Sequence, residues 1–550
     1  MKPQSPHSPA CFDGLSARGM HFCFVFKTIA LLAFAQLLSV HPLAAQVLSH
    51  GPVFGGVTEA KANVFVRTNT AATVALQYST DPGLRNPSTT SQFPAAVEHD
   101  FTTTVPLTGL TPETTYYVNV LVNGAPQLTQ PYPAFTTFPV PGTSRAFNFV
   151  VMADFRPVNK LQGEVQTYAS ASAEQPAFVF IGGDFDQRNP QTLEDRREMY
   201  KSLYDPDTPL MSGFAPLILW HMPIVHQWDD HDAGLNNVDK NYADWDLAQQ
   251  AFEEYVPTYR LPEIKPAIWQ TFQYAQADFF VLDCRSQRDP GTDPDGPNKS
   301  MLDGNALGPT GELAWLENGL LTSTAKWKII FTSVITNPTT KQNDAWGAYQ
   351  TEWNVLKNFI LTREITNVVF ISGDLHLGAI DNGTTAGFPE MCVSGANQIG
   401  TGNCATARQG IWSEGYYDKD CAGYGLVTVL QNPDRIALQA VDQFGVIRVS
   451  HTVADAASGA PVITTQPADV TVRSGEKARF QVAATGDRPL TAQWRKNGAD
   501  IEGAVRARYV TPPTIPPDNG ALYSVVISNA RGSVTSDSAM LTVVSDTSSR

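Results

Sequence analysis

Between residues 146 and 455 the chain alternates continuous apolar runs with segments of helical periodicity. A continuous apolar run of strand length indicates a strand that is buried on both faces. Such runs are FNFVVMAD (147–154), AFVFIGGD (177–184), PLILWHM (216–222), DFFVLD (278–283), KWKIIFTSV (326–334) and NVVFISGD (367–374). The helical patterns between them are EDRREMYKSLY (194–204), DLAQQAFEEYV (246–256), GELAWLENGLL (311–321) and EWNVLKNFIL (352–361). The alternation predicts an α/β domain over residues 146–455.

Residues 46–141 have a different pattern, in which apolar and polar side chains alternate in strand fashion. The phrase LTGLTPETTYYVNVLVNG (107–124) resembles a fibronectin type III domain, where a tyrosine ring packs back over the turn before its strand. We therefore expect an all-β sandwich here, followed by a linker at PVPGTSR (139–145).

A second linker is expected at ADAASGAP (454–461), and residues 462–545 resemble an immunoglobulin-like domain. Trp494 is expected as the buried core tryptophan and Tyr523 as the corner tyrosine of such a sandwich. The usual cysteines that join the two sheets are absent, and Phe480 and Val525 are expected in their place.

The first 45 residues have the pattern of an export signal. Lys27 precedes the apolar run TIALLAFAQLLSV (28–40), and HPLAA (41–45) ends in small residues, which predicts cleavage after Ala45. The run is too short to span a bilayer, although a membrane anchor is the alternative. Met20 is a second candidate start. The protein is thus expected in the periplasm, on the cell surface or outside the cell.

Charge and cysteine content limit the partners and the covalent links. The net charge of −15 argues against nucleic acid or an anionic membrane surface as a partner. In an exported protein a disulfide among Cys392, Cys404 and Cys421 is reasonable, with the pairing open, and Cys284 is expected to be a buried thiol.

Acidic residues gather where the apolar runs end. Asp154, Asp184, Asp283 and Asp374 each end a run, and WDDHD (228–232) follows a further predicted strand. A single aspartate at such a place is usually a cap or a loop hydrogen bond. Several carboxylates at the carboxyl ends of strands would repel one another unless they shared metal ions. The clustering therefore predicts a metal site.

Other residues near these ends have two interpretations each. Arg285 and Arg288 suit a bidentate grip on a phosphate, or else salt bridges to the acidic cluster. His226 is more simply a hydrogen-bonded strand-end histidine than a ligand. Trp346 and Tyr349 contact either the substrate or the core. Three further expectations are that Trp228 packs beneath the motif, that Asp186 and Gln187 are nearby oxygen donors, and that Asp303 and Asp344 are loop residues without an assignable role.

WDDH (228–231), D-x-R-x-x-R (283–288) and S-G-D-x-H (372–376), in this order, resemble the PhoD-like alkaline phosphatases of the calcineurin-like metallophosphoesterase superfamily. The resemblance implies an α/β (α+β) fold, namely a metallophosphoesterase β-sandwich flanked by helices, that holds two metal ions. It implies that Asp184 bridges the two ions, that Asp154 and His376 complete one site, and that Asp230 and Asp374 complete the other. His231 would be the general acid, with Asp229 or Asp232 orienting its ring, and Arg285 and Arg288 would hold the phosphate.

Two departures from the family pattern concern the first metal site. ADFR (153–156) has Asp154 where the family usually has a cysteine, and GDFDQ (183–187) has Gln187 where it has a tyrosine. Loss of thiolate and phenolate ligands disfavours ferric iron and favours Ca²⁺, Mg²⁺ or Mn²⁺.

The resemblance therefore implies an exported phosphoesterase that hydrolyses phosphate esters by metal-activated hydroxide. Two alternatives remain: a phosphodiesterase or phospholipase-D-like activity at the same site, and a cell-surface binding protein whose central domain has lost catalysis. A surface or polymer ligand for the immunoglobulin-like domain is a further possible partner.

Overall fold

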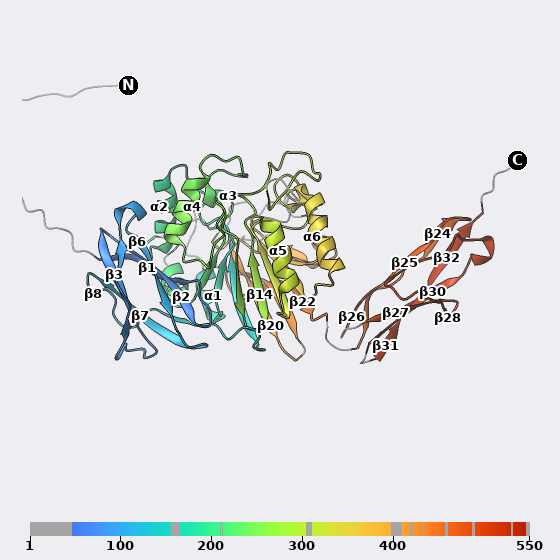
Figure 1. Cartoon of the computed structure of the whole chain (residues 1–550), viewed down its shortest axis with the longest axis horizontal. Helices are drawn as coiled ribbons and strands as arrows, with labels where there is room; N and C mark the ends of the chain where they lie inside the picture. Colours follow the sequence, from blue (N-terminus) through green and yellow to red (C-terminus); the bar gives the residue numbers. More distant parts are fainter. Residues whose placement is uncertain are drawn as a thin grey trace, which may run out of the picture. The chain divides into compact units, whose positions relative to one another are not determined.

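The computed structural model of the chain is shown in Figure 1. It describes residues 47–155, 166–208, 211, 213–303, 311–397, 410–417, 422–432, 434–456, 460–486, 490–529 and 532–545. The predicted signal segment, Cys404 and Cys421 lie outside these residues. In the described part of the chain, no helix is long and apolar enough to cross a membrane.

Two large sheets form the central domain. The first has the order β22-β21-β20-β10-β11-β12-β1-β2-β6, and the second has the order β13-β14-β15-β16-β18-β17-β19. Within the first sheet, the strands from the central part of the sequence are β10 (Phe147–Met152), β11 (Val179–Ile181), β12 (Ile224–His226), β20 (Gly423–Leu430), β21 (Arg435–Asp442) and the edge strand β22 (Ile447–Ala454). The second contains β13 (Gln270–Tyr274), β14 (Ala277–Val281), β15 (Trp327–Thr332), β16 (Val368–Ser372), β17 (Gly378–Asn382), β18 (Pro389–Cys392) and β19 (Gly415–Tyr417). Parallel pairing joins β10, β11 and β12, and likewise β14, β15 and β16.

Phenylalanine side chains fill the space between the two sheets. Phe149 stacks on Phe178 with ring centroids 4.9 Å apart, and Phe180 of the first sheet stacks on Phe331 of the second at 3.5 Å. These residues belong to one buried cluster with strand residues of both sheets. The predicted β-sandwich is confirmed.

Helices cover the outer faces of the sandwich (Figure 1). Apolar side chains of α1 (Thr167–Ala173), α2 (Leu193–Tyr204) and α4 (Trp245–Tyr255) pack on the first sheet, and those of α5 (Glu312–Thr322) and α6 (Gln350–Thr362) pack on the second. The short elements are α3 (Asp230–Ala233), η1 (Val97–His99) and η3 (Trp346–Ala348). Because the inner strands β10, β11, β14, β15 and β16 pack inward on the other sheet and outward on helices, both of their faces are apolar, as the continuous runs predicted.

One predicted strand is wrong. Within the run 216–222, residues 216–219 lie in a helical turn, η2 (Ala215–Leu219), and not in a strand. The strand that leads to the WDDH motif is β12, a few residues later. Pro216 suits the first turn of a helix, and Ala215, Ile218 and Leu219 are buried at helical spacing. A short apolar run does not distinguish a buried strand from a buried helical turn.

The N-terminal strands contribute to two sheets. β1 (Leu48–Gly55), β2 (Lys61–Thr68) and β6 (Thr102–Thr108) continue the first central sheet through the pairing of β1 with β12. The others are β3 (Ala72–Ser79), β4 (Ser88–Thr89), β5 (Phe93–Ala95), β7 (Thr115–Val122), β8 (Ala125–Pro126) and β9 (Ala134–Thr136), which form a separate sheet. The Thr111 backbone N–H donates to the Tyr116 hydroxyl at 3.0 Å, so this tyrosine does reach back over its turn.

The C-terminal strands have their own apolar core, in which Trp494, Tyr523, Phe480 and Val525 are all buried. The rings of Phe480 and Tyr523 stack at 4.4 Å. The strands are β23 (Val462–Thr465), β24 (Val470–Arg473), β25 (Arg479–Gln481), β26 (Ala483–Thr485), β27 (Thr491–Lys496), β28 (Ala499–Asp500), β29 (Arg508–Val510), β30 (Leu522–Asn529), β31 (Gly532–Thr535) and β32 (Ala539–Val544), with the turn η5 (Pro516–Asp518) after β29. Buried apolar side chains thus stand where the cross-sheet cysteines of such a domain usually lie.

Candidate metal centre

The predicted ligands lie on the loops that leave the carboxyl ends of both sheets. Asp154 follows β10, Asp184 follows β11 and Asp230 follows β12, all in the first sheet. Asp374 and His376 follow β16 in the second sheet. The two sheets therefore supply ligands from opposite sides to one place.

Four of these residues have left-handed backbone conformations. The φ angles of Asp154, Asp184, Asp374 and His376 are 56°, 52°, 67° and 58°. Such conformations are uncommon outside glycine and gather at functional sites, where the surrounding structure holds them. Each loop turns sharply as it leaves its strand, which brings Asp374 and His376, two residues apart, to the same cluster.

Gly183 allows the closest approach between these loops. A Cβ atom at this position would lie 2.6 Å from the Cβ atom of Asp229, and the φ angle of Gly183 is 96°. The Phe155 backbone N–H then donates to the Asp184 carbonyl at 2.7 Å, which ties the first loop to the second. Any side chain at Gly183 would push the loop away from the WDDH segment.

The ligand atoms form three overlapping groups, in each of which they all lie within 4.8 Å of one another. The first group contains Asp154, Asp184 and His376. The other two are Asp184 with Asp230 and His231, and Asp184 with Asp229, Asp230 and Asp374. Asp184 is common to all three, which is the placement that a ligand shared by two ions requires.

The electrostatics of this cluster favour a bound cation. Burial, reinforced by the neighbouring Asp374, raises the pKa of Asp154 well above its usual value, and burial with Asp230 nearby does the same for the pKa of Asp184. Burial raises the pKa of Asp374 to about 7, although Lys341 opposes the shift. A carboxylate that resists ionisation when alone becomes an anionic ligand once a cation lies beside it.

The residues present fit a divalent ion. Within the described residues, the buried Oδ2 atom of Asp374 accepts no hydrogen bond. The donors gathered here are carboxylate oxygens and imidazole nitrogens, which suit Ca²⁺, Mg²⁺ or Mn²⁺ and, for the imidazole, other divalent metals.

Asp230 and His231 differ in exposure. The Asp230 side chain is buried, and its oxygens accept from the His231 and Asn237 backbone N–H groups at 2.8 and 2.6 Å. Burial is the largest single influence and would raise its pKa, but the neighbouring positive charges, Arg285 first, together hold the pKa at about 2. The His231 side chain is 16% exposed, so its ring borders the solvent.

The orientation of the His231 ring comes from a residue that the sequence did not suggest. Its Nδ1 atom pairs with the Asn189 side-chain oxygen. Asp229 instead binds Arg285 and accepts from the Ser333 hydroxyl at 2.7 Å. Asp232 accepts from the Phe185 and Asp229 backbone N–H groups, both at 2.7 Å. The expectation that Asp229 or Asp232 orients the ring is therefore wrong.

Both predicted phosphate-binding arginines are buried in ion pairs. Arg285 is bidentate to Asp229 and donates to Asp344 at 2.8 Å. Arg288 donates to the Asp344 carboxylate and backbone carbonyl, at 2.8 and 2.6 Å, and to the Val238 carbonyl at 3.0 Å. The structure thus favours the salt-bridge interpretation, since either guanidinium would have to give up a bond to reach a substrate.

Asp344, which had no role in the sequence prediction, is the acceptor that these cations share. Its carboxylate receives Arg285, Arg288 and, at 3.5 Å, the ammonium group of Lys341. Burial alone would raise its pKa, but these cations, Arg285 first, hold the pKa well below its usual range. The spacing K-x-x-D (341–344) on the loop after a buried strand is the only sequence signal for the pair.

Asp283 ends a strand as predicted but lies outside the described metal groups. It accepts from the Trp228 indole at 2.8 Å, from the Ser286 hydroxyl at 2.6 Å and from the Ile268 backbone N–H at 3.1 Å. Asp283 therefore fixes loops, and Trp228 is confirmed as packing beneath the motif, 5.1 Å from Trp245.

His226 is a core residue. Its ring lies among Phe185, Tyr200 and Phe252, and burial lowers its pKa to about 3. Neither ring nitrogen has a hydrogen-bond partner among the described residues. His226 is not part of the described metal groups, and the hydrogen bond expected of it is not present among the described residues.

Of the remaining candidate residues, some border the cluster and others lie away from it. The Gln187 side-chain nitrogen lies 3.1 Å from Nε2 of His376 and 3.5 Å from Asp184, so Gln187 borders the first group, whereas Asp186 binds Arg188. Trp346 and Tyr349 are fully buried in the core. Asp303 accepts from the Leu313 backbone N–H, and Cys284 and Cys392 are buried free thiols.

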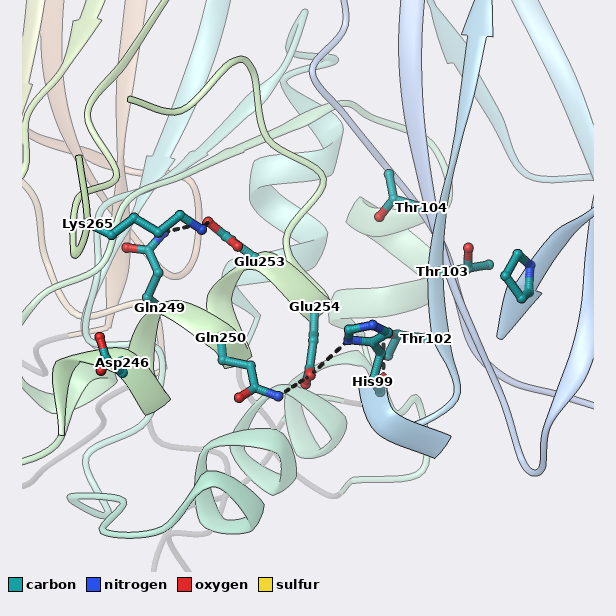
Figure 2. A pocket seen from close by; sticks show the side chains of 11 residues that line it. His99, Thr102, Thr103, Thr104, Asp246, Gln249, Gln250, Glu253, Glu254 and Lys265 are labelled. Atoms are coloured by element: carbon teal, nitrogen blue, oxygen red, sulfur yellow. Dashed lines mark hydrogen bonds and ion pairs between the residues drawn. The ribbon is translucent and has the colours of Figure 1, made fainter. Parts of the chain in front are cut away.

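A cavity of about 450 Å³ lies elsewhere, between β6 and α4 (Figure 2). Several of its polar groups are paired: Lys265 pairs with Glu253, and Glu254 accepts from Gln250 at 2.8 Å and lies 3.5 Å from His99. None of the predicted ligands lines it. The cavity is therefore separate from the candidate metal centre.

In this helix-flanked double sheet, carboxylates and a histidine gather at the carboxyl ends of the strands, which is where ligands bind in α/β sheets. Residues 159–456, more than half of the chain, match the model of the family described as PhoD-like phosphatase. The chain belongs to the PhoD-like phosphatase family.

Other comparisons agree in fold. Alkaline phosphatase D of Bacillus subtilis (strain 168) is 27% identical over 230 residues, which are 35% of this chain and 36% of that protein, so the match spans about a third of the relative's length. A solved structure of PhoD has a TM-score of 0.59 at 19% identity, covering 73% of this chain and 89% of that one. The purple acid phosphatase PPD1 from yellow lupin (Lupinus luteus) seeds has a TM-score of 0.50 at 13% identity, covering 74% of each chain.

The flanking regions also match family models. Residues 461–543 match the immunoglobulin I-set domain, which confirms the C-terminal prediction. Residues 45–140 match a family described as a domain of unknown function (DUF7800), so the fibronectin type III resemblance of this region stays a prediction.

Proposed function

We propose that this protein is an exported, metal-dependent phosphoric ester hydrolase of the alkaline phosphatase D type. The observation that carries the proposal is the convergence of Asp154, Asp184, Asp230, Asp374 and His376, from two sheets, into groups that share Asp184. Family membership supports the reaction class, and the N-terminal segment of the sequence supports export.

Two divalent cations would be held by these five residues. Asp184 would be common to both, with Asp154 and His376 on one side and Asp230 and Asp374 on the other. When bound, such cations neutralise phosphate charge and make a water molecule acidic enough to yield hydroxide near neutral pH. The donor set supports Ca²⁺, Mg²⁺ or Mn²⁺ over ferric iron, because the described groups consist of carboxylates and imidazoles without a cysteine, and Gln187 stands where the family pattern has a tyrosine.

His231 would protonate the leaving oxygen. Its ring borders solvent beside Asp230, while Asn189 holds Nδ1, which leaves Nε2 for the ester. Burial lowers the pKa of His231 in the free protein, and the neighbouring carboxylates Asp230 and Asp229 oppose that shift. A dianionic substrate beside the ring would raise its pKa further and favour the proton-donating form.

Arg285 and Arg288 would act by holding the site rather than by contact with the ester. Arg285 joins the WDDH loop, through Asp229, to the loop that contains Asp344. Buried bidentate pairs of this kind are costly to break from one side, because the remaining charge has no partner. This framework keeps Asp230 ionised and in place.

The test is hydrolysis of p-nitrophenyl phosphate and bis-p-nitrophenyl phosphate by purified protein before and after dialysis against EDTA. We expect activity to vanish on chelation and to return with Ca²⁺, Mg²⁺ or Mn²⁺. Asp184→Asn is the matched variant, and its activity should fall more than the roughly 10–100-fold that loss of a ligand's outer partner costs.

Full activity after chelation, or in Asp184→Asn, would overturn the proposal. Preference for the diester would favour the phosphodiesterase alternative at the same site. Metal binding without hydrolysis of either ester would favour a binding protein that has lost catalysis.

A further inference from the structure

The cations around the candidate metal centre differ in how freely they can move. The side chains of Arg285 and Arg288 are 0% and 1% exposed, and each is held by several acceptors. The Lys341 side chain is 14% exposed, so its end reaches the solvent side of the cluster. Among the lysines and arginines that the structure describes, only Arg285 and Lys341 form ion pairs with the predicted aspartate ligands.

The partners of Lys341 place it beside the group of ligand atoms that contains Asp374. Its ammonium group pairs with Oδ1 of Asp374, a predicted ligand, and lies 3.5 Å from Oδ2 of Asp344. Its backbone is fixed as well, because the Lys341 carbonyl accepts from the Asp344 and Ala345 N–H groups at 3.1 and 3.0 Å. Lys341 thus lies on an ordered turn with its charge facing a carboxylate that a metal ion would take.

A metal ion on Asp374 would compete with the ammonium group for the negative charge of the same carboxylate, whose Oδ1 atom pairs with Lys341 and whose Oδ2 atom accepts no hydrogen bond from the described residues. Asp344 would still hold Lys341 close by, since it lies on the same turn and is not in any of the described metal groups. A lysine ammonium is a compact charge on a flexible stem with three donors, so it can turn while its backbone stays fixed. The arginines beside it lack this freedom, because several buried acceptors hold each of them.

We propose that Lys341 binds the phosphate of the substrate, and that in the metal-free protein it occupies Asp374 in place of the second cation. The inference rests on the proposed function. It assigns to Lys341 the phosphate contact that the sequence alone suggested for Arg285 and Arg288. Lys341 then has opposite effects on two ligands: it competes with the metal and attracts the phosphate.

The alternative is a purely structural lysine that stabilises buried carboxylates. The two interpretations predict opposite changes in metal affinity when Lys341 is replaced. Lys341→Met removes the competing charge, so a phosphate-binding lysine predicts tighter metal binding and weaker phosphate binding. A structural lysine predicts that both weaken together with the thermal stability.

The experiment titrates Mn²⁺ into EDTA-treated protein, and then inorganic phosphate into the Mn²⁺-loaded protein, by calorimetry. In Lys341→Met we expect several-fold tighter Mn²⁺ binding and about 10–100-fold weaker phosphate binding, the range for loss of a charge-assisted hydrogen bond. Lys341→Arg should restore part of the phosphate affinity. In ester hydrolysis, KM should rise more than kcat falls.

Lys326→Met is the matched control. Lys326 also pairs with two aspartates, Asp434 and Asp455, but it precedes β15, whereas Lys341 follows that strand. The Lys326→Met substitution should leave the Mn²⁺ and phosphate affinities unchanged.

Unchanged phosphate binding in Lys341→Met, or weaker binding of both ligands, would overturn the assignment while the proposed function stands. A wild-type protein that binds Mn²⁺ but neither binds phosphate nor hydrolyses esters would overturn both.

Discussion

The aromatic core lies on the strands and the carboxylate cluster on the loops that follow them, only a few residues further along the chain. Phe180 stacks on Phe331 between the sheets, and Asp184, just beyond the end of β11, faces four other carboxylates. The phenylalanines occupy extended strands and are buried among apolar neighbours. The cluster instead combines left-handed backbone conformations with carboxylates whose pKa is raised by burial.

The difference shows how the fold divides its tasks. Burial of aromatic side chains stabilises the two sheets and fixes where their strands end. That fixed frame supports loops whose conformations and charges are unfavourable on their own. Substitutions in the core should therefore change stability, and substitutions in the cluster should change activity.

Of the substitutions that test the comparison between core and cluster, His231→Ala, in the cluster, should have the largest effect. Loss of the proton donor should lower kcat for p-nitrophenyl phosphate by about 10²–10⁴-fold, the usual range for general acid–base catalysis. The loss should be larger for phenyl phosphate, because its less acidic leaving group depends more on protonation. Steady-state kinetics with both esters measures this.

The thermal unfolding midpoint of His231→Ala should stay near that of the wild type, because the His231 side chain is partly exposed. An equal loss of kcat with both esters would contradict the role of His231 as the acid.

Phe331→Ala tests the core side of the comparison. Removing a fully buried ring that stacks on Phe180 should lower the free energy of unfolding by about 3–5 kcal/mol. Activity per folded molecule should stay near that of the wild type. Denaturant unfolding and kinetics well below the transition measure the two quantities, and a loss of activity as large as that of His231→Ala would contradict the division of tasks.

The buried strands and the gathering of carboxylates where they end could be predicted because their signals are local. A strand buried on both faces is a continuous apolar run, and an aspartate follows within a few residues. The failed prediction at residues 216–222 shows the limit: a run of that length is compatible with a strand and with a buried helical turn.

The partners of the ligands could not be predicted, because they come from distant segments. Arg285 binds Asp229 and Asp344, 56 and 59 residues away, and Asn189 reaches His231 across 42 residues. Side chains such as Asp344 and Lys341 follow no recognisable motif. Their roles depend on which loops meet, and that is set by the packing of the two sheets.

His226 and His231 repeat the comparison within one segment. His226 ends β12 with its ring enclosed by aromatic side chains, whereas His231, five positions later, borders the solvent beside Asp230. Burial lowers the pKa of His226 to about 3, below the usual value of 6.5. The folded state therefore resists protonation of His226, while the unfolded state accepts the proton.

The direction in which stability changes with pH follows from which state, folded or unfolded, binds the proton on His226. The neutral imidazole leaves stability unchanged above about pH 6.5, and stability is lost as the pH falls from 6.5 towards 3, where the unfolded state binds more protons.

His226→Phe keeps an aromatic ring in the same place and removes the titration. Its free energy of unfolding should match the wild type at pH 7.5 within about 1.5 kcal/mol. At pH 4.5 it should exceed the wild type by roughly 2–3 kcal/mol, measured by urea unfolding at both values. Equal pH dependence in the two proteins would mean that His226 is protonated within the fold, and that the aromatic surroundings do not exclude charge as the comparison requires.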